Sequence, residues 1–212
     1  MRLPPDQTLK RVAVFGIEST GKSTLAEFLG RHYGAPVAPE FVRAFWDAHD
    51  GQIGASDLGE IARGQMAAED AAAAAALARW GGRGGRAQRA LASESPPPVA
   101  PSPPLRAPLI ICDTELLTNQ LYDDLLFPGH CPEWLRAEAE QRSRRYALYL
   151  LCGIDIPFVP DRMRGVSDPA RRAQWQALWR ETLVSRGLPF VDICGEWPER
   201  QRRAVAAIDA LL

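Results

Sequence analysis

The chain has 212 residues, of which 46% are hydrophobic and 24% charged, and its formal net charge is −1. This composition can fill the core of one sizeable globular domain. The near-neutral charge argues against a general nucleic-acid or membrane-surface binder, because both classes need a basic excess. No apolar run approaches the roughly 18 residues that cross a bilayer, and the first residues lack the apolar core of a signal peptide. We therefore expect a cytoplasmic protein that binds neither nucleic acid nor membrane.

Short apolar segments alternate with helical segments along the chain, which is typical of a parallel sheet covered by helices on both faces. Each predicted strand is rich in Val, Ile, Leu or Phe, as strands buried on both faces are. The predicted strands are Arg11–Phe15, Val37–Pro39, Leu109–Cys112, Ala147–Leu151 and Phe190–Ile193. We predict a single α/β domain over residues 1–212, with a central, mostly parallel five-stranded sheet.

The helical segments have apolar residues at helical spacing or a composition of strong helix formers. They are predicted at Lys22–Tyr33, Ser56–Arg79, Thr114–Leu125, Glu133–Ser143, Asp168–Arg186 and Glu199–Leu212. Ser56 and Asp168 are candidate N-caps, and Pro169 suits the first helical position.

Residues 81–108 differ in composition from the rest of the chain. Two Gly-Gly-Arg units open the segment, and seven prolines follow from Pro96 to Pro108. Such a segment has few apolar side chains to bury, so we predict a flexible, partly polyproline-like insert. An arginine-glycine RNA-binding segment is the alternative, but two units are few for that role.

The segment Gly16–Ser23 has the spacing G-x-x-x-x-G-K-[ST] and lies between a predicted strand and a predicted helix. In this motif, the P-loop, main-chain amides and the helix N-terminus surround phosphates, the lysine reaches the β- and γ-phosphates, and the hydroxyl ligates Mg²⁺. Lys22 is one of only two lysines in the chain, which indicates a site that needs a compact ammonium rather than the planar guanidinium of arginine. A chance glycine-rich turn is the alternative. The predicted nucleotide-binding residues are Gly16, Glu18, Ser19, Thr20, Gly21, Lys22, Ser23 and Thr24.

Asp113 follows directly after the third predicted strand. An acid at this place is the Walker B arrangement, in which the carboxylate holds Mg²⁺ directly or through water. Ser23 and Asp113 are therefore the predicted metal ligands. The alternative is that Asp113 caps the next helix.

Glu40 follows the second predicted strand, and ligands of open α/β sheets bind at the carboxyl ends of strands. We expect Glu40 near the γ-phosphate, where it would bind an acceptor hydroxyl or take its proton; Asp113 is the other candidate for that base. Arg43, one turn further on, would position polar or anionic groups. Trp46 would stack on a planar ring or belong to the core. An ordinary solvated helix start is the alternative for the whole segment.

An arginine-bearing loop is predicted at residues 155–165, followed by Arg171 and Arg172. Such a flap can exclude water and neutralise charge on a transferring phosphoryl group. A solvated basic patch is the alternative. The predicted catalytic residues are Lys22, Glu40, Asp113, Arg164 and Arg171.

Together these motifs resemble the ribosylnicotinamide kinase domain of the NadR family, a group of P-loop kinases, without its nucleotidyltransferase domain. The resemblance covers nearly the whole chain apart from the insert. It rests on Gly16–Thr24 with its Glu-Ser-Thr, and on Pro39–Arg43, Ile61–Gln65, Cys112–Glu115 with Thr118, Asp155–Phe158 and Phe190–Gly195.

The resemblance implies transfer of phosphate from ATP to the 5′-hydroxyl of nicotinamide riboside, with Mg²⁺, to give nicotinamide mononucleotide for NAD salvage. Gly195 and Arg200, after the last strand, would border the adenine. Two alternatives are a kinase of another nucleoside and a nucleotide-dependent switch that binds a protein partner. The predicted acceptor cleft and the arginine-rich flap favour a kinase.

Overall fold

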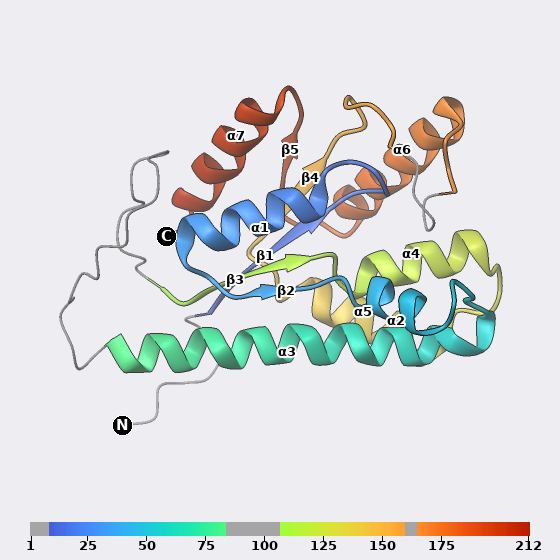
Figure 1. The fold of residues 1–212 in the computed structure, drawn as a ribbon, viewed down its shortest axis with the longest axis horizontal. Coiled ribbons are helices and arrows are strands. Elements are labelled where there is room, and N and C mark those ends of the chain that lie inside the picture. The colour runs from blue at the N-terminus through green and yellow to red at the C-terminus, as the bar shows by residue number, and fades with distance from the viewer. Residues whose placement is uncertain (1–8, 84–106, 160–164) are drawn as a thin grey trace.

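The computed structural model describes residues 9–83, 107–159 and 165–212. Its centre is a five-stranded sheet in the order β2-β3-β1-β4-β5, and every neighbouring pair is parallel (Figure 1). The strands are β1 (Lys10–Phe15), β2 (Val37–Ala38), β3 (Leu109–Asp113), β4 (Leu148–Cys152) and β5 (Phe190–Ile193). The predicted α/β fold is therefore confirmed, and each strand boundary lies within one residue of its expected place.

The helices are α1 (Lys22–Tyr33), α2 (Phe41–Ala48), α3 (Leu58–Arg83), α4 (Leu116–Leu126), α5 (Glu133–Ser143), α6 (Pro169–Ser185) and α7 (Trp197–Asp209). The sequence predicted all of these except α2. In α2 the apolar residues Phe41, Val42, Phe45 and Trp46 recur at helical spacing. A segment of only 8 residues is too short for this period to stand out. Within the described ranges, no helix is both long and apolar enough to cross a membrane.

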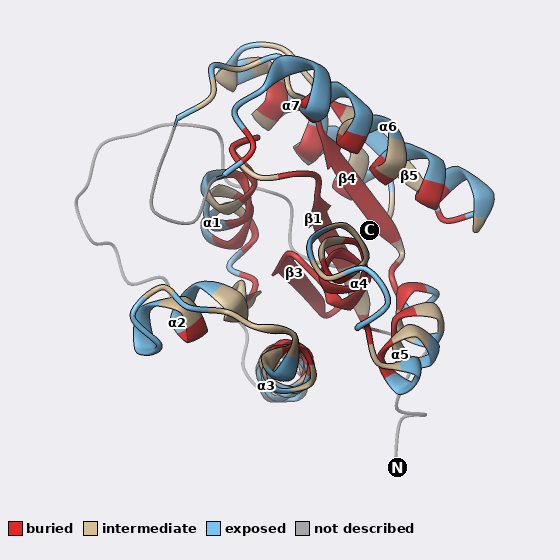
Figure 2. Ribbon diagram, turned by 90° about the vertical axis from the view of Figure 1, so that its right-hand side faces the viewer, coloured by how far each residue is buried: buried red, intermediate tan, exposed pale blue. Residues whose placement is uncertain are grey.

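The two faces of the sheet bury alternate strand residues, as the two-residue period of a strand requires. In β1, Val12 and Val14 pack with α1 and α7 on one face. Ala13 and Phe15 pack with α3, α4 and α6 on the other. Figure 2 shows the central strands coloured as buried, with helices on both sides. The sheet is thus a rigid base for the loops at its edges.

Helix α3 differs from its predicted bounds at both ends. It begins at Leu58, after a 3₁₀ turn in which the Asp57 carboxylate accepts the Gly54 amide at 2.8 Å, so Ser56 is not its N-cap. It ends at Arg83 instead of Arg79, so the helix continues through Gly81 and Gly82 despite the low helix propensity of glycine. The start of the segment predicted as an insert is therefore helical. Its main part, residues 84–106, lies outside the described residues.

The caps of α4 and α6 show which acids are used for structure. Asp168 accepts the Arg171 amide at 2.7 Å and precedes Pro169, which confirms the predicted cap of α6. The cap of α4 is the fully buried Glu115, which accepts the amides of Leu117 at 2.8 Å and Thr118 at 3.1 Å. Asp113 is therefore not the cap of this helix.

Candidate active site

The predicted site segments all lie at one edge of the sheet. The P-loop follows β1, Glu40 follows β2 and Thr114 follows β3, while Gly153 and Gly195 follow β4 and β5. Because every strand pair is parallel, these carboxyl ends meet at the same edge. The topology thus collects residues from distant parts of the sequence.

The shape of the P-loop depends on two glycines. Gly16 has φ 144°, and a Cβ there would lie 2.9 Å from the carbonyl oxygen of Cys152. Gly21 is left-handed, with φ 78°, at the N-cap of α1. A side chain at either position would strain the turn. The Thr20 hydroxyl donates to the Ile17 carbonyl at 2.8 Å and closes the loop from within.

Lys22 crosses this loop. Its Nζ donates to the Ile17 carbonyl at 2.8 Å, and the side chain is buried. The ammonium therefore lies among the main-chain amides that start α1, where an anion would find several donors. This geometry matches the phosphate-binding role predicted for Gly16–Thr24.

Asp113 has the properties of a magnesium ligand. It is buried, and its Oδ1 finds no hydrogen-bond partner. Burial and then the neighbouring Glu40 carboxylate raise the pKa of Asp113 to about 6, while Lys22 and a hydrogen bond with Ser23 lower it. A carboxylate oxygen beside a hydroxyl is a donor set that Mg²⁺ accepts, because this ion completes its shell with waters and nucleotide phosphates. The two predicted ligands are thus adjacent and suit the ion.

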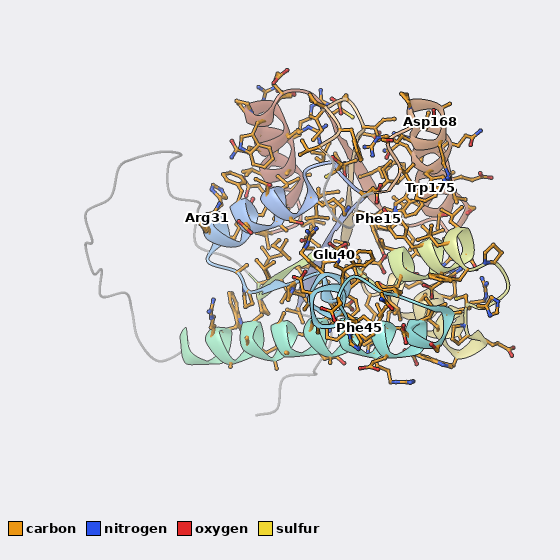
Figure 3. The ribbon with its side chains drawn as sticks, turned by 45° about the vertical axis from the view of Figure 1, so that its right-hand side comes forward. Phe15, Arg31, Glu40, Phe45, Asp168 and Trp175 are labelled. Atoms are coloured by element: carbon orange, nitrogen blue, oxygen red, sulfur yellow. The ribbon has the colours of Figure 1, made fainter. Side chains whose placement is uncertain are left out.

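Glu40 lies at the start of α2, and Phe45 is further along the helix toward α3 (Figure 3). Its carboxylate accepts the Thr114 hydroxyl at 3.2 Å and the Arg43 guanidinium at 3.3 Å. Gln65 of α3 accepts the Phe41 amide at 2.9 Å and donates to the Thr114 carbonyl at 3.4 Å. The buried Gln65 therefore holds the start of α2 to the end of β3, a role that its place within a predicted helix did not reveal.

A cavity of about 270 Å³ opens beside the P-loop. Its polar lining residues include Lys22, Ser23, Glu40 and Thr114. Its apolar lining residues include Trp46, Ile53, Leu58, Ile61, Leu126 and Phe127. The structure thus brings the predicted acceptor residues Glu40, Arg43 and Trp46 together with Lys22 in the lining of one cavity.

Trp46 is half-buried and lies near the end of α2. Its indole packs against Gly51, where a Cβ would lie 3.1 Å from the ring. Gly51 is left-handed, with φ 78°. The same side chain lines the cavity. The ring thus packs against Gly51 and borders the cavity, where its stacking on a planar ring stays a prediction.

One wall of the cavity comes from α4 and was not predicted as part of the site. The lining residues on this helix are Thr118, Asn119, Tyr122, Asp123 and Leu126. They recur at helical spacing, and the polar members are buried. The sequence therefore contained a signal for this wall, namely polar residues that recur on the inward face of a buried helix.

The two adjacent arginines of α6 have different environments. Arg171 is exposed, and its guanidinium lies 5.3 Å from the Trp175 ring. Arg172 is 4% exposed and donates to the carbonyls of Ser19 and Val166, each at 3.3 Å. Arg172 thus contacts the P-loop, whereas the described contacts of Arg171, the predicted catalytic residue, include none with the P-loop. Arg164 lies outside the described residues.

Described parts of the loop after β4 are also attached to the P-loop. The Val159 amide donates to the Ser19 hydroxyl at 2.9 Å, and the Val166 amide donates to the Glu18 carboxylate at 2.6 Å. The Glu18 amide in turn donates to the Tyr122 hydroxyl at 2.8 Å. Glu18 and Ser19 therefore connect the P-loop to the flap and to the cavity wall.

Arg200 is only 2% exposed and is held by main-chain groups. It donates to the carbonyls of Gly195 at 2.8 Å, Thr20 at 3.1 Å and Gly153 at 3.2 Å, and it pairs with Asp155. The guanidinium thus joins the P-loop to the loops after β4 and β5. These contacts suit a supporting role better than the predicted contact with adenine. Gly195 is held at the same edge, where its amide donates to Asp155 at 2.5 Å.

A family model described as AAA domain matches residues 11–80 and 104–200, which is most of the chain. The chain belongs to this family. No curated protein matches it. The match to this AAA-domain family spans both the P-loop and the edge loops described above.

Two solved structures of NadR protein share the fold of this AAA-domain chain. One is a complex with NR, at a TM-score of 0.66 and 21% identity, covering 97% of this chain and 52% of that one. The other is a complex with NAD and AMP-PNP, at a TM-score of 0.65 and 22% identity, covering 96% and 49%. The chain thus spans about half the length of the NadR chains, and the fold implied by the predicted resemblance is confirmed.

Proposed function

We propose that the chain is a kinase that transfers the γ-phosphoryl group of ATP to the 5′-hydroxyl of nicotinamide riboside. The main support is the cavity, which begins at Lys22 and Ser23 and continues along Glu40 and Trp46. A triphosphate bound at the P-loop would therefore face a space suited to a small acceptor. A pure nucleotide switch has no need of such a space.

The choice of nicotinamide riboside rests on the resemblance of the motifs to the NadR family. It is supported by the solved NadR structures, one of which holds NR and another NAD with AMP-PNP. The shared fold makes this acceptor the first candidate for our chain.

We assign each side chain the role that its contacts allow. Lys22 and the P-loop amides would hold the β- and γ-phosphates, and Ser23 with Asp113 would hold Mg²⁺. The ion would neutralise phosphate charge and orient the γ-phosphoryl group. Glu40 lines the cavity, so we assign it to the acceptor hydroxyl, which it would orient and whose proton it would take.

Positioning residues would then set the geometry that phosphoryl transfer requires. Gln65 and Thr114 would hold Glu40 at the acceptor, and Arg172 would hold Ser19 of the P-loop. Arg164 and Arg171 remain candidates for charge neutralisation over the phosphoryl group.

The proposal is tested by incubating the purified chain with ATP, Mg²⁺ and a panel of ribonucleosides and deoxyribonucleosides that includes nicotinamide riboside. Products are scored by mass, and parallel reactions contain GTP. Nicotinamide mononucleotide as the main product supports the proposal. Phosphorylation of a different nucleoside would show that the proposed acceptor is wrong. ATP hydrolysis at a rate that no nucleoside changes would indicate a nucleotide switch instead of a kinase.

A further inference from the structure

Asp123 is a charged residue of the cavity wall that the proposed transfer does not use. It lies on α4, lines the cavity and is 6% exposed. Its Oδ2 is buried and has no hydrogen-bond partner. Burying a carboxylate with an unsatisfied oxygen costs free energy, so its presence in a ligand cavity calls for a reason.

In the described part of the chain, Asp123 forms no ion pair with a basic group. Arg136 of α5, whose charge acts on Asp123, pairs instead with Asp124, at 2.9 Å from its Oδ2. Burial raises the pKa of Asp123 to about 7; a hydrogen bond with Cys131 and the charge of Arg136 lower it, while Asp124 raises it. The carboxylate would therefore gain from a cation in the cavity.

The position of Asp123 along the cavity indicates which part of an acceptor it would contact. Helix α4 begins beside Thr114, which binds Glu40, and follows the cavity to Leu126. At a rise of about 1.5 Å per residue, Asp123 lies roughly 10 Å beyond the start of the helix. The next turn of α4 carries Leu126, which lines the same cavity as Trp46. Asp123 thus lies about two helical turns from Thr114 and Glu40, on the part of the wall that continues to Leu126.

The other charged groups of the cavity already have partners or assigned roles. Glu40 pairs with Arg43, Lys22 belongs to the phosphates, and the Glu18 carboxylate accepts the Val166 amide. Asp123 therefore adds negative charge to a cavity that Trp46 and other apolar side chains also line. A flat cationic ring matches this lining twice, because an aromatic face and a carboxylate both attract a cation.

We propose that Asp123, together with Trp46, selects acceptors whose ring carries a positive charge, the N-glycosylpyridinium class, over neutral nucleosides. This inference rests on the proposed kinase function and adds to it the chemical reason for the substrate class. A neutral ring would lie beside the buried carboxylate without compensating it.

The test compares two acceptors that differ in ring charge but keep the same ribose and amide: nicotinamide riboside and its neutral dihydro form. We expect wild-type kcat/KM to favour the cation by about tenfold or more, the size of one charged contact. Asp123→Asn keeps the shape of the side chain and should lower this preference about tenfold, through the cationic acceptor alone. Asp47→Asn, an exposed change of the same charge beside Trp46, should leave the ratio unchanged.

The possible failures can be told apart. If wild type phosphorylates both forms equally, or if Asp123→Asn leaves the ratio intact, the inference is wrong and the kinase stands. A parallel loss with both forms would mean a structural or ribose-binding role, and would also overturn it. If neither form is phosphorylated, the proposed function fails, and calorimetric binding of the two forms to wild type and Asp123→Asn then decides. Equal affinities would overturn the inference.

Discussion

The two ends of the cavity are built in different ways. The phosphate end is one continuous turn, closed by hydrogen bonds from Thr20 and Lys22 to Ile17, only 3 and 5 residues away. The acceptor end joins α2, α3 and α4, and its Thr114–Glu40 bond spans 74 residues. Local sequence thus builds the part that any P-loop kinase needs, whereas tertiary packing builds the part that would choose an acceptor. Substitutions at the first end should affect every acceptor, and substitutions at the second should change the choice.

The largest effect should come from the phosphate end. Lys22→Ala removes the ammonium that would neutralise the β- and γ-phosphates, so we expect turnover to fall by about 10³-fold or more with every acceptor. Circular dichroism should show an intact fold. The control is Lys10→Ala, which changes the other lysine of the chain at the far end of β1. Substantial turnover by the Lys22 variant would refute the phosphate site.

Glu40 and Asp113 can be separated by different measurements. Glu40→Gln should lower kcat by about 10²-fold or more, because proton transfer from the acceptor loses its base. Its magnesium requirement should stay unchanged. Asp113→Asn should instead raise the Mg²⁺ concentration needed for half-maximal activity. The opposite pattern would exchange the two roles and place the base beside Ser23.

The same contrast explains what the sequence could predict. The strands and the P-loop follow from composition and local spacing, so their positions were correct to within a residue. Gln65 and the α4 wall were missed as site residues, because each lies within a helix whose inward face depends on packing. Arg200 looked like a ligand contact because it follows a strand end, yet its guanidinium binds main-chain carbonyls.

Adjacent residues on a helix point about 100° apart, so local sequence could not decide between Arg171 and Arg172. The contact with Ser19 predicts that Arg172→Ala will raise the KM for ATP about tenfold, because the P-loop loses a charged hydrogen bond. Arg171→Ala should change it by less than about twofold, since the side chain is exposed. An equal or larger effect at Arg171 would show that it moves to the phosphates during the reaction.

The charge at the acceptor end should make selectivity depend on pH. Because the pKa of Asp123 is raised to about 7, its carboxylate is ionised mainly above that pH. Asp124, Cys131 and Arg136 are the ionisable groups that act on it. The preference for nicotinamide riboside over its dihydro form should therefore rise severalfold from pH 6 to pH 8. The ratio should be flat in Asp123→Asn; a matching slope there would assign the titration to another group.

The smallest effect should come from Glu69, which lies one turn beyond Gln65 on α3. Glu69 is 5% exposed, and burial raises its pKa to about 7. The folded chain therefore binds a proton more tightly than the unfolded chain, and this carboxyl lowers stability as pH rises from about 4.5 to 7. Glu69→Gln removes that dependence, so its Tm relative to wild type should rise by about 2 °C or more between pH 5 and pH 8.

Glu69 also lies 3.7 Å from Arg142, which keeps its bonds to Asp70 at 3.0 and 3.1 Å in the variant. Glu138→Gln removes a more exposed partner of the same arginine and controls for the loss of an ion pair. A constant Tm difference across pH would assign the titration elsewhere. Because Glu69 is not among the residues that line the cavity, its variant should keep the wild-type acceptor ratio. A changed ratio would mean that acceptor choice depends on packing beneath the wall as well as on the side chains that face the ligand.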